Sequence, residues 1–357
     1  MAWDTLKESL LSELAQRIDD RAEPSDRESL HNLSAAFYSR FPAEDMRGLS
    51  VENLYGCLYG LLRFMLKWPD KQPKIRIFNA EIQSHGWESK YTTLVILCRG
   101  IPFTTASVRG ELNRRNLRIH TIASSNLAVS RDGEGNLEQV LSSENGDSVE
   151  HPEALLFFEI GRHSNPDELA ELRDTLAEIL AEVTVVVDDF PAMCERLHEV
   201  SAAIRACECV IPDYRDEAAA FIEWIEQDHM LFLGYEYLQV KRSGKSTRIK
   251  VNKKASLGLL RQRESRGVPD LQADLQNMSL EQLHKKQLSF SNSRVRSRVH
   301  RLTYPDYVTV KVFDEEGELI GQHRIIGLYT SSVYTMNPRL IPILRRKVEQ
   351  ILALSNK

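Results

Sequence analysis

The sequence predicts an α+β protein in which helices come first, a ferredoxin-like sandwich follows, and a second antiparallel sheet completes the chain. Three patterns carry this prediction: helical apolar spacing before residue 70, alternating short strands and amphipathic helices up to residue 206, and strand pairs joined by turns after it. The 357 residues are too many for one ordinary domain. The predicted parts are residues 1–70, 71–206 and 207–357.

Residues 1–70 are predicted to form three helices. Apolar residues recur at helical spacing in the first, at Leu6, Leu10, Leu14 and Ile18. Ser25 is expected to cap a second helix that runs through Tyr38. The third, residues 51–68, is the most apolar run, but charged residues such as Arg63 interrupt it and it is short for a membrane span. We therefore expect a buried helix and no membrane segment.

Residues 71–206 carry the predicted sandwich. Segments with alternating or β-branched apolar residues are predicted strands, at 74–78, 91–97, 118–130, 154–160 and 183–187. Helical spacing predicts helices over 103–116, 169–180 and 191–206. From residue 91 the order is strand, helix, strand, strand, helix, strand. Right-handed crossovers fold this order into an antiparallel sheet with both helices on one face.

The last part is predicted to form an antiparallel sheet flanked by helices. Its predicted strands are 230–240, 247–251, 295–302, 307–313 and 319–329. The first two form a hairpin through Ser243-Gly244-Lys245. A charged stretch, 262–286, is expected to be mobile. Asn337 as cap and Pro338 in the first turn start a final helix through Ala353.

Composition limits the class of protein. The chain has 46 basic and 51 acidic residues, a net charge of -5, and 42% hydrophobic residues. These values fit a soluble globular protein and argue against a general nucleic-acid binder. Five cysteines, an odd number in a long chain, do not fit a disulfide framework, so a cytoplasmic location is expected. Charged residues between Asp4 and Glu13 argue against a secretory signal.

Two motifs are weak. Gly133-Glu134-Gly135-Asn136-Leu137-Glu138 matches half of a dinucleotide-binding fingerprint, but it lacks the third glycine and a following helix. A hairpin turn is the preferred interpretation, and we expect no cofactor site in this chain. Cys194 and His198 are four positions apart, and Cys207 and Cys209 follow. These residue types hold zinc, yet cysteine is commonly a small buried residue, so we expect no metal site.

Five basic residues crowd eight positions near the end of the chain, namely Arg294, Arg296, Arg298, His300 and Arg301. On a strand, alternate arginines would line one face and suit phosphate groups. No aromatic residues interleave with them, so a nucleic-acid surface is the minority interpretation. A subunit interface or an anion contact is preferred.

The link between the strand at 91–97 and its helix is a candidate effector-binding site. Its residues are Arg99, Gly100, Ile101, Pro102, Phe103, Thr104, Thr105 and Ser107. A glycine lets the backbone approach a bound group, and the N–H groups of a helix start attract carboxylate. An ordinary tight turn explains the same residues, and both interpretations stay open.

Several strings of residues together resemble the large bacterial NAD-specific glutamate dehydrogenases, whose subunits are far longer than this chain. In the first half the strings are Leu54-Tyr55-Gly56, Arg76-Ile77-Phe78-Asn79, His85-Gly86-Trp87, Pro102-Phe103 and Glu111-Leu112-Asn113-Arg114-Arg115. In the second half they are Asp228-His229, Phe232-Leu233-Gly234-Tyr235, Leu257-Gly258-Leu259-Leu260-Arg261 and a terminal run from Val299 to Val348. The resemblance runs nearly end to end.

The resemblance implies a non-catalytic regulatory and oligomerisation region, with an ACT-like domain over 71–206 and a PAS-like domain over 207–357. The parent enzyme would oxidatively deaminate L-glutamate to 2-oxoglutarate with NAD, and this chain alone is expected to be inactive. Its partners would be downstream dehydrogenase domains, sister subunits in a homo-oligomer, and a small amino-acid or anionic effector. A free-standing ligand-sensing or interaction protein descended from that region is the alternative.

One departure from the family concerns the candidate effector-binding site. Family members usually carry acidic residues just before the proline-phenylalanine pair and another four residues after that proline. Arg99, Gly100 and Ala106 occupy those places here. Without these carboxylates to hold an ammonium group, we expect an altered site that favours an anionic partner group.

Overall fold

The computed structural model describes residues 2–142, 152–243, 246–265, 279–285 and 287–355. The chain forms two compact units, Met1–Val183 and Thr184–Lys357. The boundary between them falls inside a single long helix, α6 (Pro166–Ala206). None of the helices in the described ranges has both the length and the apolar character needed to cross a bilayer.

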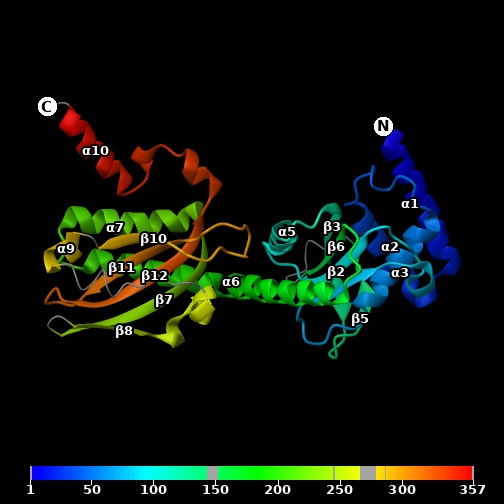
Figure 1. The fold of residues 1–357 in the computed structure, drawn as a ribbon, viewed down its shortest axis with the longest axis horizontal. Coiled ribbons are helices and arrows are strands. Elements are labelled where there is room, and N and C mark those ends of the chain that lie inside the picture. The colour runs from blue at the N-terminus through cyan, green and yellow to red at the C-terminus, as the bar shows by residue number, and fades with distance from the viewer. Residues whose placement is uncertain (1, 143–151, 244–245, 266–278, 286, 356–357) are drawn as a thin grey trace. The chain divides into compact units, whose positions relative to one another are not determined.

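Unit 1 contains one four-stranded sheet and six helices in its described residues. The helices are α1 (Ala2–Arg21), α2 (Pro24–Tyr38), α3 (Val51–Met65), α4 (Ile82–His85), α5 (Thr104–Arg114) and the first part of α6. The sheet strands are β1 (Lys74–Asn79), β2 (Thr92–Arg99), β3 (Ile119–Leu127) and β6 (Glu153–Ile160). Their order is β1-β2-β6-β3, and each neighbouring pair is antiparallel. Figure 1 labels β2, β3 and β6 of this sheet.

Helices cover both faces of this sheet. On one face, α5 and α6 pack Leu112 and Leu176 against β2 and β6 residues such as Ile96. On the other face, α1, α2 and α3 form a core that reaches Phe157 of β6. Both predicted sandwich helices therefore lie on one face, as expected, while the N-terminal helices fill the other. This burial on two faces explains the nearly unbroken apolar run of β2.

The strand predicted at 183–187 is wrong, because these residues belong to α6. Val183 and Val186 are buried and continue the helical spacing set by Leu176 and Leu180. Burial at helical period outweighs the preference of a valine run for strands. β1, which precedes β2 in the sequence, takes the edge position beside β2 that this strand would have filled.

The N-terminal helix predictions have mixed outcomes. The second helix begins at Pro24 with Glu23 as its cap residue, so the prediction that Ser25 caps it is wrong. The fixed φ of proline suits the first helical position. The apolar run is confirmed as a buried helix, α3, and its start is capped by the Ser50 hydroxyl, which accepts a hydrogen bond from the Asn53 N–H.

The glycine pair near residue 134 lies in a hairpin, as predicted. Strands β4 (Val129–Arg131) and β5 (Leu137–Val140) pair antiparallel on either side of it. Asp132 holds the turn because its Oδ1 accepts hydrogen bonds from the N–H groups of Glu134 and Asn136, both at 2.9 Å. The half fingerprint is thus a turn motif.

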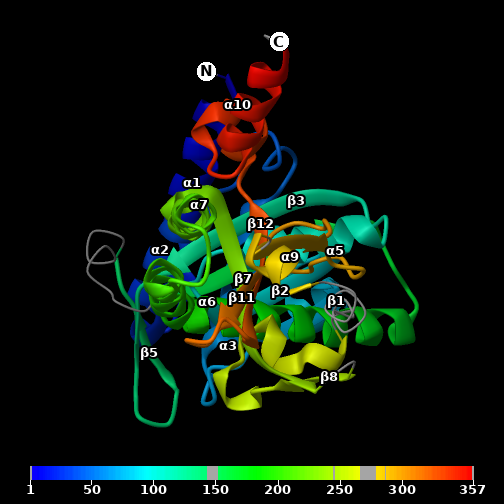
Figure 2. The same ribbon diagram turned by 90° about the vertical axis from the view of Figure 1, so that its left-hand side faces the viewer.

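Unit 2 contains an antiparallel sheet with the order β10-β11-β12-β7-β8, and β9 pairs with β7. Its strands are β7 (Met230–Ser243), β8 (Ser246–Val251), β9 (Leu257–Gly258), β10 (Leu288–Asn292), β11 (Asp306–Phe313) and β12 (Leu319–Tyr329). Its helices are the end of α6, α7 (Pro212–Trp224), α9 (Leu280–Lys285) and α10 (Leu344–Ser355) (Figure 2). The predicted hairpin strands pair as β7 and β8, and residues 244 and 245 of its turn lie outside the described residues.

The two faces of the second sheet differ in chemistry. One face packs against α6 and α7 through an apolar core that includes Val200, Ile222 and Ile325. The opposite face carries Arg324 of β12, whose Nη1 lies 3.3 Å from Oε1 of Glu236 on β7, and both side chains are fully buried. The two residues are register partners on central strands, and removing one of them would leave a buried charge without its partner.

Two predictions in the last part are corrected. Residues 295–302 are a loop, and the edge strand is β10 at Leu288–Asn292, because serine hydroxyls turn the backbone at Ser293 and Ser297. The final helix is interrupted: Asn337 caps a short 3-10 turn, Pro338–Leu340, and α10 starts only at Leu344. Most of the stretch expected to be mobile, 266–278, lies outside the described residues.

Replacing the buried aromatic ring at position 157 tests the two-faced burial of the first sheet. The Phe157 ring lies 5.4 Å from that of Phe37 and 6.3 Å from that of Trp87. We expect Phe157→Ala to lower the free energy of unfolding by about 3–5 kcal/mol, because it opens a cavity in the core. Urea unfolding followed by tryptophan fluorescence measures this.

The matched control is Ile82→Ala, since Ile82 is 60% exposed in the same unit. It should change the free energy of unfolding by less than about 0.5 kcal/mol. Equal losses in the two variants would contradict the packing of α1, α2 and α3 against β6.

Candidate functional site

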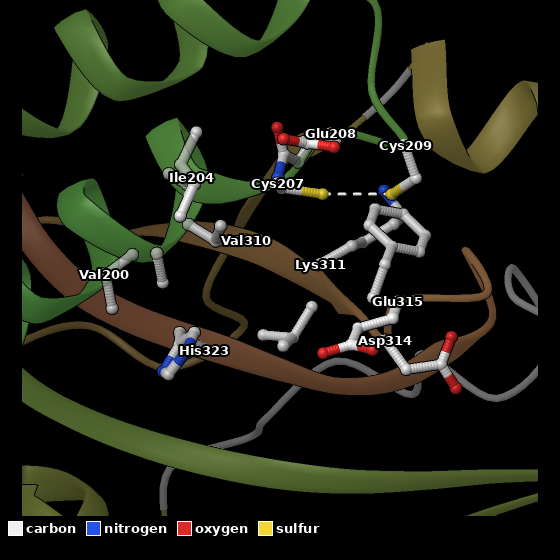
Figure 3. A pocket seen from close by; sticks show the side chains of 15 residues that line it. Val200, Ile204, Cys207, Glu208, Cys209, Val310, Lys311, Asp314, Glu315 and His323 are labelled. Carbon is white, nitrogen blue, oxygen red and sulfur yellow. Dashed lines mark hydrogen bonds between the residues drawn. The ribbon is translucent and has the colours of Figure 1, made fainter.

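A cavity of about 610 Å³ lies in unit 2, where α6 ends beside the sheet (Figure 3). Its wall is apolar on one side, with Val200 and Ile204 from α6 and Val310 from β11. The remaining wall carries thiol, charged and other polar side chains, which are Cys207, Glu208, Cys209, Gln287, Lys311, Asp314, Glu315 and His323. The apolar side could hold a small molecule, and the polar groups could fix its orientation.

Two thiols meet in the turn between α6 and α7. The Sγ atoms of Cys207 and Cys209 lie 3.0 Å apart, and both side chains are half-buried. Burial, followed by the hydrogen bond to Cys207, raises the pKa of the Cys209 thiol to about 12. Cys209 therefore keeps its proton at neutral pH.

His323 is a neutral, hydrogen-bonded residue of the same cavity. Burial lowers the pKa of His323 to about 4. Burial also raises the pKa of Tyr235, so its hydroxyl keeps its proton, and the hydroxyl oxygen shares a hydrogen bond with His323 Nδ1, 2.7 Å away. This hydrogen bond fixes the orientation of the neutral imidazole in the cavity wall.

The cysteines and histidine discussed as zinc ligands do not come together. Cys207 and Cys209 line the cavity, whereas Cys194 and His198 are not among its lining residues. The His198 Nε2 lies 2.8 Å from Oε1 of Glu226 instead. Across the described ranges, no three His, Cys, Asp or Glu side chains are grouped as a metal site requires.

In unit 1, the candidate effector-binding site is a tightly bonded turn between β2 and α5. The Gly100 N–H donates to the carbonyl of Pro152 at 2.7 Å, and a Cβ at position 100 would lie 2.8 Å from that oxygen. Glycine is therefore required by this close approach. Phe103 adopts φ = 70° just before α5 begins.

The hydroxyl groups of this turn already have partners. The Thr104 hydroxyl donates to the carbonyl of Ile101 at 2.7 Å, and that of Ser107 donates to the carbonyl of Phe103 at 2.8 Å. The Thr105 hydroxyl lies 3.0 Å from Ser124 Oγ on β3. The structure thus brings these predicted residues together, with their hydroxyls used to shape the turn.

Glu111 ties α5 to α6. Its carboxylate is 1% exposed and accepts hydrogen bonds from Arg114 and Arg115, each at 2.7 Å. Burial alone raises the pKa of Glu111, but the hydrogen bonds and charges of the two arginines outweigh it, and the pKa is lowered. Arg115 also donates to Glu171 and Thr175 of α6. This motif of the family resemblance is therefore a helix-to-helix link.

The five basic residues near the end of the chain lie in the loop between β10 and β11, so they do not line one face of a strand. The Arg296 guanidinium lies over the Tyr304 ring, 5.2 Å from its centroid. Arg301 donates a hydrogen bond to the carbonyl of Tyr329. His300 adopts φ = 66°, and burial, then the charge of Arg301, lowers its pKa. The interface or anion contact stays a prediction.

The cavity itself was missed by the sequence interpretation. Lys311, Asp314 and His323 are far from the cysteines in sequence and reach the cavity only through the pairing of β11 with β12. The only local signal was the spacing of Cys207 and Cys209.

The depressed pKa of His323 predicts a pH effect on stability. As the pH falls below 6.5, the ordinary pKa of histidine, His323 binds a proton in the unfolded chain. In the folded chain His323 binds this proton only near pH 4. Stability is therefore lost as pH falls through this window. We expect wild type to lose roughly 2 kcal/mol more between pH 7 and pH 5 than His323→Gln does. Urea unfolding at both values measures this, and parallel losses would contradict it.

Comparisons with known proteins agree with the described architecture. The family model "Glutamate dehydrogenase, ACT1 domain" matches residues 33–176. The NAD-specific glutamate dehydrogenase of Halomonas elongata is 34% identical over 99% of this chain, and that of Pseudomonas aeruginosa is 31% identical over 97%. The chain spans 22% and 21% of their lengths.

A solved structure of an RNA-binding light-oxygen-voltage receptor aligns over 88% of the chain with a TM-score of 0.16 and 9% identity, which is too low to indicate a shared fold. The family match covers α5 and the whole first sheet, and the two dehydrogenases match along nearly the whole chain. The chain therefore carries a glutamate dehydrogenase ACT1 domain over residues 33–176 and is similar, along nearly its whole length, to about one fifth of the large bacterial NAD-specific glutamate dehydrogenases.

Proposed function

We propose that this chain is a non-catalytic regulatory and oligomerisation region of a large cytoplasmic NAD-dependent glutamate dehydrogenase. The ACT1 match over residues 33–176 is the observation that carries the proposal. The parent enzyme would deaminate L-glutamate oxidatively to 2-oxoglutarate. Hydride transfer would belong to the remaining four fifths of the protein, since the chain spans about one fifth of the curated relatives.

The proposed effector contact is the start of α5. The first N–H groups of a helix have no acceptor within it, and the helix dipole favours negative charge there. Arg99 adds a positive charge at the end of β2. Because Gly100 and Ala106 stand where relatives usually have carboxylates, the proposed ligand presents a carboxylate to this turn, as an amino acid or a dicarboxylate does.

The proposed route of regulation runs from α5 to α6. Glu111 holds Arg115, and Arg115 bonds to Glu171 and Thr175 of α6. An effector that favours one position of α5 would therefore bias α6, the helix in which the two units meet along the chain. Such coupling requires that the effector bind two conformations with different affinity.

Unit 2 is proposed to be a PAS-like assembly module. Its antiparallel sheet flanked by helices supports this proposal. The partners would be sister subunits of a homo-oligomer and the downstream dehydrogenase domains. The exposed apolar residues of α10, Ile351 at 65% and Leu354 at 71%, support contact with such a partner.

Calorimetric titration of the purified chain with amino acids and dicarboxylates tests the effector proposal. We expect binding that Arg99→Ala weakens about tenfold, the loss of one charge-assisted contact. The matched control is Arg109→Ala, which removes an equally charged, exposed side chain from α5 and should bind as wild type does.

Gly100→Asp is a poor test of the same site, because a side chain at position 100 collides with the Pro152 carbonyl. If no carboxylate ligand binds, or if Arg99→Ala and Arg109→Ala bind equally well, the effector proposal is wrong.

A further inference from the structure

The turn between α6 and α7 places two thiols side by side. Cys207 follows the last residue of α6, and its N–H donates to the carbonyl of Ile204 at 3.2 Å. Val210, one residue after Cys209, is buried and anchors the far end of the turn. Cys207 and Cys209 are thus held from both ends, with their Sγ atoms 3.0 Å apart (Figure 3).

This arrangement sets the pair apart from the other cysteines of the chain. Cys57 and Cys98 are buried, and burial raises the pKa of each thiol. Cys194 lies on α6, where burial also raises its pKa. All five cysteines are in the described ranges, and the contact between Cys207 and Cys209 is the single sulfur-to-sulfur hydrogen bond found there.

The pair is also open to small molecules. Both thiols line the 610 Å³ cavity and are half-buried, so a reagent that enters the cavity reaches sulfur directly. A disulfide needs the sulfurs to move from 3.0 Å to about 2.05 Å. The two residues lie in one turn with a single residue between them, so about 1 Å of sulfur movement separates the dithiol from a bonded pair.

We propose that Cys207 and Cys209 form a redox site that interconverts between a dithiol and an intrachain disulfide by exchange with a small-molecule disulfide such as glutathione disulfide. Thiol–disulfide exchange of this kind needs one attacking thiolate and a second, resolving thiol. Cys209 is assigned as the resolving thiol, because burial and the hydrogen bond to Cys207 raise the pKa of Cys209 to about 12. We assign the first attack to Cys207, an order that the two cysteine variants test.

The exchange runs in two displacements. The Cys207 thiolate attacks one sulfur of glutathione disulfide, whose S–S bond breaks and releases one glutathione thiolate, leaving a mixed disulfide on Cys207. Cys209 then loses its proton to solvent, attacks the Cys207 sulfur and displaces the second glutathione. Two electrons pass from the pair to glutathione disulfide, which becomes two glutathione thiols once both thiolates take up protons.

Equilibration of the full chain with mixtures of reduced and oxidised glutathione tests this site. After alkylation and trypsin digestion, residues 206–215 form one peptide that contains both cysteines, because Arg205 and Arg215 are the flanking cleavage sites. We expect this peptide to carry two alkyl groups in excess glutathione, and to be unalkylated and two hydrogen atoms lighter than the free dithiol peptide as the glutathione disulfide fraction rises.

Cys207→Ser and Cys209→Ser separate the roles of the two sulfurs. Cys209→Ser should stop at a stable glutathione adduct on Cys207, whereas Cys207→Ser should react at least tenfold more slowly. Cys194→Ser is the matched control and should behave as wild type, and circular dichroism of each variant confirms folding.

Three results would overturn the proposal. The first is a wild-type chain that accumulates the glutathione adduct without the internal disulfide. The second is a peptide 206–215 that stays reduced in glutathione mixtures that oxidise a small reference dithiol. The third is a Cys194 that forms an adduct as fast as Cys207 does. None of these outcomes depends on whether the chain binds a carboxylate effector.

Discussion

Burial of the central strands of the first sheet on both faces is the constraint on which unit 1 depends. β2 and β6 pack against α5 and α6 on one side and against α1, α2 and α3 on the other. A ferredoxin-like sandwich normally covers one face, so here the N-terminal helices must supply the second cover. The ACT1 match begins at residue 33, inside α2, which agrees with a domain that includes part of this cover.

The same packing positions the candidate effector-binding site. β2 ends at the Gly100 turn, α5 starts directly after it, and Glu111 fastens α5 to α6 through Arg115. Unit 2 follows a related plan with different chemistry, because its second face holds the buried pair Glu236–Arg324. Its cavity lies where α6 ends and the two thiols begin, so the candidate sites of both units lie at the ends of packed elements.

Sequence patterns predicted the elements whose apolar residues recur at a clear strand or helix period. They failed where helical burial, a side-chain hydrogen bond or strand pairing sets the backbone conformation. The apolar run of β2, the α3 helix and the hairpin at Asp132 followed from periodicity and turn chemistry. The strand expected at 183–187 failed because valines at helical spacing continue α6. The strand predicted over the basic segment is wrong because the hydroxyls of Ser293 and Ser297 accept backbone hydrogen bonds and turn the chain. Both serines begin Ser-Arg-Val triplets, a signal that is visible in the sequence. The cavity needed the register of β11 with β12, which no local pattern contains.

Native-state hydrogen exchange of the full chain tests most directly whether the N-terminal helices and the first sheet are one structural unit. If they share the core that includes Leu58 and Phe157, the slowest amides of α3 and of β2 open in one event with the same free energy and the same denaturant dependence. The account would be contradicted if the opening free energy of the slowest α3 amides were about 2 kcal/mol or more below that of the slowest β2 amides. The sheet would then remain folded while the N-terminal helices that pack on its second face unfold.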